Sequence, residues 1–252
     1  MESSRRCVHN PSREFYAVIP LTLLGLNGSS AFLHQVLILS IISFLGGNLL
    51  FGMAYFAPTI LFSMGYSAVR TQLMSVPPYA ATFVISIAIA MFSDRWHQRG
   101  YALFFSAAVA LAGYIIFLTS TQTSVLYGSL FLQTVGAFTA APAGTTWNVN
   151  NVQPYCKRST AVGLVTSMAG VGGILSTWMF DDPPRFRKAT TINIAFSIGI
   201  CVLAMVNRVW LVMQNKRKEE ERARRQPLGS EKEEEAERRR LGDDHPDFIY
   251  TL

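Results

Sequence analysis

The distribution of charge constrains the fold of this chain more than any other feature. Six long apolar stretches follow one another, and none of them contains Asp, Glu or Lys: residues 36–62, 76–92, 101–119, 125–146, 160–180 and 190–213. Spanning the hydrocarbon core of a bilayer takes ~20 mostly apolar residues. In lipid every backbone polar group must be bonded within the protein, so stretches of this length form helices. We predict an all-α membrane protein with a bundle of six transmembrane helices.

Acidic residues divide the chain into an apolar part and a polar tail. Eleven of the sixteen Asp and Glu lie after residue 213, although only 15% of all residues are charged. We therefore predict an N-terminal segment over residues 1–35, the transmembrane domain over 36–213 and a charged cytosolic tail over 214–252. The tail pattern is typical of a solvated helix or a disordered segment.

The loops between the apolar stretches differ in their content of Lys and Arg. One set of loops and the adjoining tail carry thirteen, whereas the opposite set carries four: Arg70, Arg185, Arg187 and Lys188. By the positive-inside rule, both termini are expected in the cytosol of a multi-pass integral membrane protein.

Residues 15–27 are apolar but too short to span a bilayer. A seventh helix, a signal-like segment and an interfacial segment are all possible interpretations, and we favour the interfacial segment. Glycosylation of Asn27 would contradict this orientation.

The second and third apolar stretches are joined by the short charged loop of residues 93–100, SDRWHQRG. Asp94 follows the expected C-terminus of a helix, where the helix dipole disfavours an anion. It therefore needs a cationic partner, either Arg95 or Arg99, or the N-terminus of another helix. Gly100 closes the loop. A loop this tight joins two antiparallel membrane helices on one side of the bilayer.

Small residues recur at helical spacing within the apolar stretches. In the fourth stretch these are Gly136, Ala140 and Gly144, and in the fifth Gly170 and Gly173. Small residues let helix backbones approach closely in lipid. The same smooth faces suit the sliding that alternating access requires. Static packing explains the spacing equally well, and the sequence leaves both interpretations open.

No Asp, Glu or Lys lies inside a span, so any coupling to an ion would need another polar group or a carboxylate elsewhere. The polar candidates within the spans are Asn48, Tyr55, Gln133 and Asn193. The fourth stretch ends in Trp147, Asn150 and Asn151, which offer a flat apolar face and side-chain amides able to bond a carboxylate. A Trp at the membrane interface followed by a cap and a turn is the alternative.

The sequence offers no support for an enzyme. The three Cys and four His are scattered without metal-ligand spacing, and nucleotide-binding, hydrolase and metalloprotease motifs are absent. We expect no catalytic residue, no metal, no cofactor and no nucleic-acid partner. A six-helix channel would need a pore signature, and none is found.

Two motifs and the tail together resemble a known family. The loop SDRWHQRG resembles the cytosolic motif of the major facilitator superfamily, in its second-half copy. In that family such a loop latches one half of the transporter against the other, so the resemblance implies a cytosolic gating loop that contains Asp94, Arg95, Arg99 and Gly100. The stretch GTTWNVNNVQPYCKRSTAVGLVTSMAGVGGI, which starts at Gly144, is similar to the fungal anion:cation symporter branch, which includes allantoate and nicotinate permeases. The segment from Gly242 to Phe248 looks like the tail of that branch. The resemblance covers residues 40–252, whereas residues 1–35 match no part of the family that we recognise.

The resemblance implies a fold, a function and a set of partners. The fold would be the C-terminal half of a twelve-helix transporter, and the loop 181–188 is shorter than in the family. The function would be transport of a small organic anion or vitamin-like carboxylate across the plasma membrane by alternating access, with a proton as candidate co-substrate. Tyr55, Trp147, Asn150 and Asn151 would lie near the substrate path. A truncated gene product is one hypothesis. A non-transporting fragment that acts only by assembling with itself or with a separate half is the alternative.

Overall fold

The computed structural model describes residues 30–96, 98–153, 155–180, 186–224, 245 and 247–252. Within these residues the chain forms six long helices and no strand: α3 (Ser30–Ser63), α4 (Ala68–Trp96), α5 (Arg99–Thr119), α6 (Thr123–Asn151), α7 (Tyr155–Thr177) and α8 (Arg187–Arg224). All six are long and apolar enough to cross a membrane. The prediction of an all-α membrane bundle with six spans is confirmed.

The helices are longer than the apolar stretches from which they were predicted. α4 begins at Ala68, eight residues before the stretch that opens at residue 76, and α8 continues to Arg224 through a highly charged sequence. A helix does not have to end at the membrane surface, because its backbone hydrogen bonds form within the helix both in lipid and in water. Part of the expected tail is thus helical. Residues 15–27, His97, most of the 181–188 loop and most of the tail lie outside the described residues.

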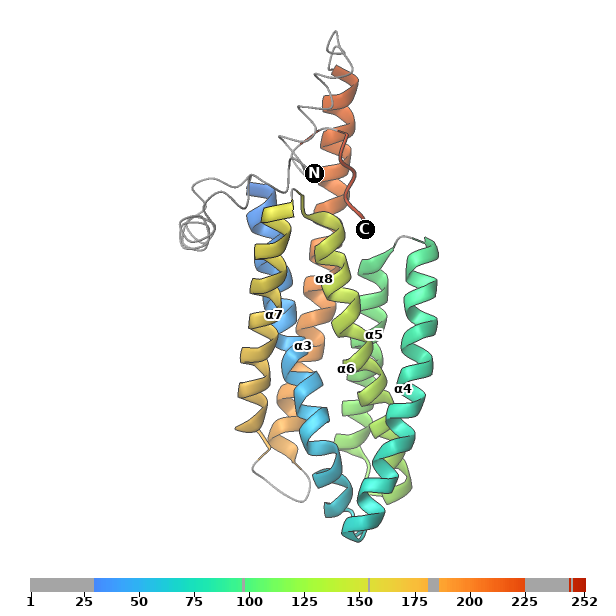
Figure 1. Cartoon of the computed structure of the whole chain (residues 1–252). Coiled ribbons are helices and arrows are strands. Elements are labelled where there is room, and N and C mark those ends of the chain that lie inside the picture. The colour runs from blue at the N-terminus through green and yellow to red at the C-terminus, as the bar shows by residue number, and fades with distance from the viewer. Residues whose placement is uncertain (1–29, 97, 154, 181–185, 225–244, 246) are drawn as a thin grey trace.

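The helices form a bundle with α3, α5 and α6 at its centre. α3 packs against α7, α6 and α8, and α5 packs against α6 and α8. α4 and α7 lie on opposite sides (Figure 1), and α4 packs mainly on α6. More than half of the most apolar 18 residues of α3 are buried, compared with 17% for α4. α4 therefore presents most of its apolar surface outward.

Glycine shapes the turn between α3 and α4. Gly65 has a φ of 94°, in the left-handed region that residues with a side chain rarely adopt. Its N–H donates to the carbonyl of Phe62 at 3.0 Å, so it closes the last turn of α3 in the way that glycine commonly ends helices. The chain can then reverse within a few residues and enter α4.

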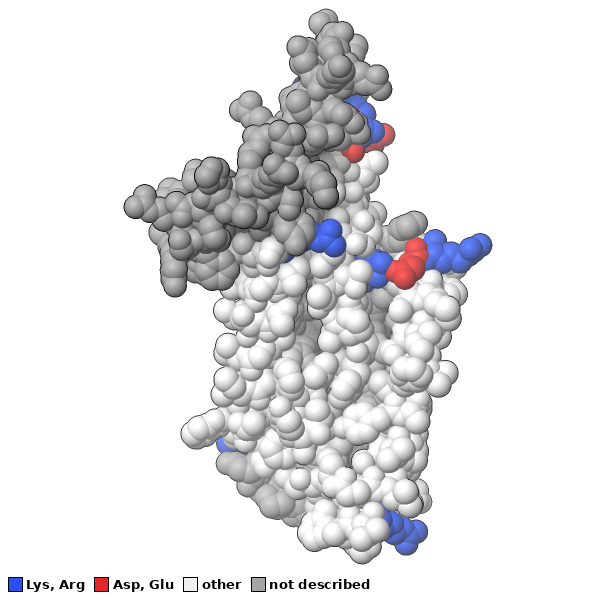
Figure 2. Space-filling model, in the orientation of Figure 1, with Lys and Arg blue, Asp and Glu red and all other residues white. Residues whose placement is uncertain are grey.

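Charged side chains gather at the two ends of the bundle. Figure 2 shows blue and red residues in the upper part of this face and blue residues near its lower end, with uncharged residues between them. One end carries Asp94 and Arg95 in the last turn of α4, Arg99 in the first turn of α5 and the described C-terminal residues, and we call it the basic end. Most of the described residues of the predicted loop 93–100 are therefore helical. The opposite end carries Arg70, Arg187 and Lys188. This separation is what insertion in a bilayer requires.

Candidate functional site

The four candidates for the substrate path divide into two pairs. Trp147 and Asn151 are completely buried at the basic end of α6. Asn150, their neighbour in sequence, is exposed on another side of the same helix. Tyr55 is 60% exposed on α3, where its ring stacks on Phe51 with 6.1 Å between centroids. The structure therefore does not bring the four side chains together within the described residues.

Trp147 and Asn151 are occupied by the C-terminal residues of the chain. The indole Nε1 of Trp147 and the Nδ2 of Asn151 both donate to the main-chain carbonyl of Thr251, each at 2.9 Å. The N–H of Thr251 donates in return to Oδ1 of Asn151 at 2.7 Å. Their polar groups were expected to face a substrate path, but here they bind the polypeptide. The receptor of these residues could not be identified from the sequence, because the partners are about a hundred residues apart.

The charged loop between α4 and α5 is closed by an ion pair. Arg99 pairs with Asp94, which identifies the cationic partner that Asp94 needs. The side chain of Arg99 is 15% exposed and that of Asp94 is 60% exposed, so the pair lies at the surface of the protein. Arg95, the other arginine considered, is exposed. A partly exposed pair of this kind contributes ~0–1 kcal/mol to stability.

Gly100 brings this loop into contact with Trp147. A Cβ at Gly100 would lie 3.2 Å from the Cη2 and Cζ2 atoms of Trp147 and 3.3 Å from Cδ of Arg208, closer than side chains normally approach. The guanidinium of Arg208 lies over the ring of Tyr101, 3.9 Å from its centroid. This cation–π contact accommodates the single basic residue that the sequence placed inside a span. Trp147 thus touches both the loop and the C-terminal residues.

Two of the buried polar residues inside the bundle bond to helix backbones. Nδ2 of Asn48 on α3 donates to the carbonyl of Gly172 on α7 at 3.2 Å, and Nε2 of Gln133 on α6 donates to the carbonyl of Gly113 on α5 at 3.3 Å. Each amide therefore ties two adjacent helices together. Hydrogen bonds of this type are a common stabilising element between membrane helices.

Three other asparagines are buried without a hydrogen-bond partner among the described residues. They are Asn148 on α6 and Asn193 and Asn207 on α8, and their exposures are 0 to 1%. An unpaired amide in an apolar interior is costly. Of these three, only Asn193 was among the polar candidates named from the sequence.

No group of His, Cys, Asp and Glu able to hold a metal ion is found in the described part of the chain.

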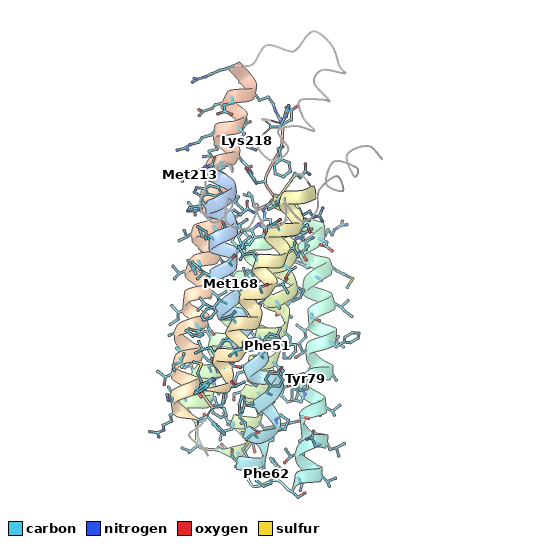
Figure 3. The ribbon with its side chains drawn as sticks, turned by 60° about the vertical axis from the view of Figure 1, so that its left-hand side comes forward. Phe51, Phe62, Tyr79, Met168, Met213 and Lys218 are labelled. Atoms are coloured by element: carbon cyan, nitrogen blue, oxygen red, sulfur yellow. The ribbon has the colours of Figure 1, made fainter. Side chains whose placement is uncertain are left out.

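The packing glycines are partly those that the sequence pattern selected. A Cβ at Gly136 would lie 2.4 Å from the N of Ala110 on α5, and one at Gly173 would lie 2.5 Å from the ring of Phe51 on α3 (Figure 3). Ala140 is buried. Gly144 and Gly170 have no atom of a neighbouring element within 4 Å of an added Cβ. Neither glycine therefore lies at a close helix crossing in the described structure.

The closest approach of all involves two glycines that the pattern did not select. A Cβ at Gly172 would lie 2.0 Å from the carbonyl oxygen of Phe44, and one at Gly47 would lie 2.1 Å from the carbonyl oxygen of Ala169. Both glycines lie where α3 crosses α7. The backbones are in direct contact there, so only glycine fits.

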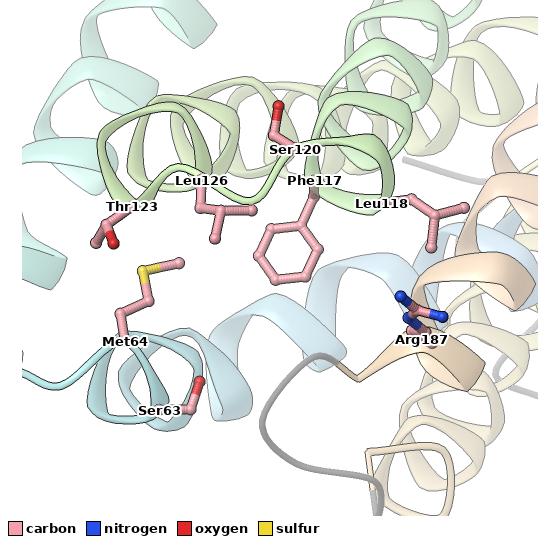
Figure 4. Close-up of a pocket in the computed structure, with 8 residues that line it drawn as sticks. All are labelled: Ser63, Met64, Phe117, Leu118, Ser120, Thr123, Leu126 and Arg187. Atoms are coloured by element: carbon pink, nitrogen blue, oxygen red, sulfur yellow. The ribbon is translucent and has the colours of Figure 1, made fainter.

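A small cavity opens at the end opposite to the basic end. Its volume is about 230 Å³, and Figure 4 shows side chains from α3, α5, α6 and the start of α8 around it. Phe117, Met64 and Leu126 give it an apolar lining, and Arg187 is its one charged residue. Ligand pockets usually enclose ~300–1,000 Å³. The cavity is below that range and contains none of the predicted site residues.

Comparison with known proteins identifies the family. The sequence model of the Major Facilitator Superfamily matches residues 9–177. This match begins well before residue 36, so it includes most of the N-terminal segment for which no resemblance was expected. No solved structure matches the chain.

Several fungal transporters are similar in sequence. An uncharacterized transporter of Schizosaccharomyces pombe is 33% identical over 171 residues, which are 68% of this chain and 34% of the relative. The high-affinity nicotinic acid transporter of Saccharomyces cerevisiae is 30% identical over 202 residues, which are 79% of this chain and 37% of that protein. A second S. pombe transporter is 30% identical over 84% of this chain and 42% of its own length. The chain spans well under half of the length of these relatives. It belongs to the major facilitator superfamily of membrane transporters.

Proposed function

We propose that this chain forms one half of a transporter that carries a small organic anion, such as a vitamin-like carboxylate, across the plasma membrane by alternating access. The observation that supports this most strongly is the six-helix bundle in a chain that belongs to a transporter superfamily. The anionic substrate is suggested by the relative that transports nicotinic acid. A proton is the candidate co-substrate.

The basic end is proposed to face the cytosol, with both chain termini on that side. The excess of Lys and Arg there supports this orientation. The loop 93–100 would then be a cytosolic gating element in which the Asp94–Arg99 pair holds the ends of α4 and α5 together. Arg95 is exposed and free to meet a partner, and Gly100 keeps the loop against Trp147.

The residues proposed for the substrate path take different roles. Tyr55 and Asn150 are exposed, so they are available for contact with a substrate or with a second half. Trp147 and Asn151 are bonded to the chain itself, so they would act on the path indirectly, by fixing the basic end of α6.

A non-transporting fragment that acts only through assembly is the second candidate. The exposed apolar residues of α4 favour it, since Val69 is 83% and Leu73 is 71% exposed. A helix of this kind is covered by lipid or by another protein. The partner would be a separate six-helix half or a second copy of this chain.

Uptake of radiolabelled nicotinate and related anions distinguishes the two functions. Cells that lack their own uptake would carry an empty vector, this chain alone, or this chain with the N-terminal half of the nicotinic acid transporter. We expect uptake above the vector only with the added half, because half a cavity leaves the substrate exposed to lipid. If no anion is taken up in any combination although the chain reaches the membrane, the transport proposal fails and the assembly function remains.

A further inference from the structure

The C-terminal residues 247–252 lie against two helices that do not pack on each other. Asn151 belongs to α6, and Asn215 belongs to the part of α8 that projects from the bundle. α6 and α8 are not a packed pair, and each packs instead on α5 and on α3. Any link between their basic ends therefore passes through the neighbouring helices or through the C-terminal residues.

Two asparagines bind successive peptide units of this segment in the same way. Asn215 donates from Nδ2 to the carbonyl of Tyr250 and accepts from the N–H of Tyr250, both at 2.9 Å. Asn151 makes the equivalent pair of bonds with the N–H and carbonyl of Thr251. A side-chain amide used in this way satisfies both main-chain groups of a residue, as a neighbouring β-strand would. Asn151 and Asn215 together thus recognise an extended peptide.

Side chains of the segment add specificity. Tyr250 is 2% exposed, whereas Ile249 is 67% exposed, so alternate residues face inward and outward. Nζ of Lys218 lies 4.3 Å from the ring centroid of Tyr250 and 5.1 Å from that of Phe248, and it donates to the carbonyl of Phe248 at 3.3 Å (Figure 3 labels Lys218). Asp247 pairs with Arg222 at 2.9 Å. A buried aromatic ring between polar anchors is typical of a binding site for a peptide.

We propose that the basic ends of α6 and α8 form a binding site for the chain's own C-terminal peptide, and that the bound peptide acts as a clasp that ties α6 to α8. The ligand is an extended segment with an aromatic residue two positions before its C-terminal Leu252. Since Trp147 bonds to Thr251 and packs beside Gly100, the clasp also holds the first turn of α5. By linkage, whatever moves α6 away from α8 must release the peptide.

Hydrogen exchange of the full-length chain in detergent tests the peptide site. The amides of Tyr250 and Thr251 should exchange slowly. Asn215→Ala should accelerate exchange at Tyr250, and Asn151→Ala should accelerate it at Thr251, each by roughly tenfold, the factor that a bond of ordinary strength provides. Tyr250→Ala should release the peptide and so accelerate exchange at both amides. Asn150→Ala and Ile249→Ala are matched controls that should leave both amides protected.

The clasp itself is tested by distance measurements between the two helices. Spin labels at exposed positions 150 on α6 and 209 on α8 should give a narrow distance distribution in the full chain. Deletion of residues 248–252 should broaden it, and Ile249→Ala should leave it unchanged.

Three outcomes would overturn the proposal. The first is rapid exchange at both amides in the unsubstituted chain, which would show that the site is empty. The second is an unchanged distance distribution after deletion of residues 248–252, which would show that the peptide does not hold α6 and α8 together. The third is protection that disappears on dilution of the protein, because the peptide would then come from a second copy. Normal protein yield and an unchanged elution profile for each variant exclude misfolding as the cause of faster exchange.

Discussion

Replacement of Gly172 by Ala is the sharpest test of how the bundle is held together. A Cβ at this position would lie 2.0 Å from the carbonyl oxygen of Phe44 and 3.0 Å from the backbone N of Asn48. Carbon and oxygen atoms in close contact between helices are normally ~3.3–3.6 Å apart, so α7 would have to move by roughly 1 Å or more. Both obstructing atoms belong to the backbone of α3, and no change of rotamer relieves the overlap.

The energetic effect follows from that displacement. Overpacking of a tight interior by one methyl group costs ~1–3 kcal/mol. Moving α7 also stretches the 3.2 Å bond from Asn48 to the carbonyl of Gly172, which is worth up to ~1–2 kcal/mol between membrane helices. We expect Gly172→Ala to destabilise the protein by about 2–4 kcal/mol, which corresponds to a fall in Tm of several degrees at ~2–4 °C per kcal/mol.

Thermal unfolding of the purified protein in detergent measures this effect. Gly163→Ala and Gly170→Ala are matched controls on the same helix, because an added Cβ meets no atom of a neighbouring element at either position. Both should leave Tm within about 1 °C of the parent or raise it slightly, since Ala is the better helix former. If Gly172→Ala has the Tm of Gly170→Ala, the backbone contact between α3 and α7 does not exist in the folded protein.

Three further predictions concern the other contacts. Gly136→Ala should destabilise by about 1–3 kcal/mol, whereas Gly144→Ala on the same helix should not, and a comparison of their Tm values checks this. Asn48→Ala should destabilise by about 0.6–2 kcal/mol through loss of its interhelical bond, and unfolding in denaturing detergent should show it. Asp94→Asn should change stability by less than about 1 kcal/mol, because the pair with Arg99 lies at the surface, and added salt should reduce the difference from the parent.

The membrane fold could be predicted because lipid leaves few alternatives. Six long apolar stretches without Asp, Glu or Lys can only be helices there, and six helices are found among the described residues. The ends of the helices could not be predicted in the same way. The polar sequences before residue 76 and after residue 213 continue as helix outside the apolar stretches, where hydropathy carries no signal.

The choice of packing glycine on α7 shows a different limit. Gly170, Gly172 and Gly173 lie within four residues, and successive residues of a helix point ~100° apart. Gly170 and Gly173 therefore point only ~60° apart, whereas Gly172 points ~100° away from Gly173 and ~160° away from Gly170. A count of small residues cannot decide which of these directions meets the backbone of α3. The position of Phe44, on a helix more than a hundred residues earlier, decides it. An added Cβ at Gly170 meets no atom of a neighbouring element, whereas one at Gly173 would lie 2.5 Å from the ring of Phe51.

The C-terminal peptide was the part of the site that the sequence analysis missed. A signal was present, because the five residues from Phe248 to Leu252 are uncharged and follow a long run of charges. An uncharged, partly aromatic end of this kind is unusual for a solvated tail. Its receptor was not visible, because Asn151 and Asn215 are separated from it by 100 and 35 residues.

The two interpretations of the small-residue faces can now be compared. Sliding between helices requires smooth surfaces without directional bonds. The two close crossings, of α3 with α7 and of α5 with α6, each carry a hydrogen bond between the helices. Asn48 bonds across α3 and α7 beside Gly172, and Gln133 bonds across α5 and α6 to the carbonyl of Gly113. A slip of one residue would break these bonds and drive backbone atoms together. The structure therefore favours static packing at both crossings. In the alternating access that we propose, a change of access would then move the bundle as a body or move α4, the least buried of the six described helices.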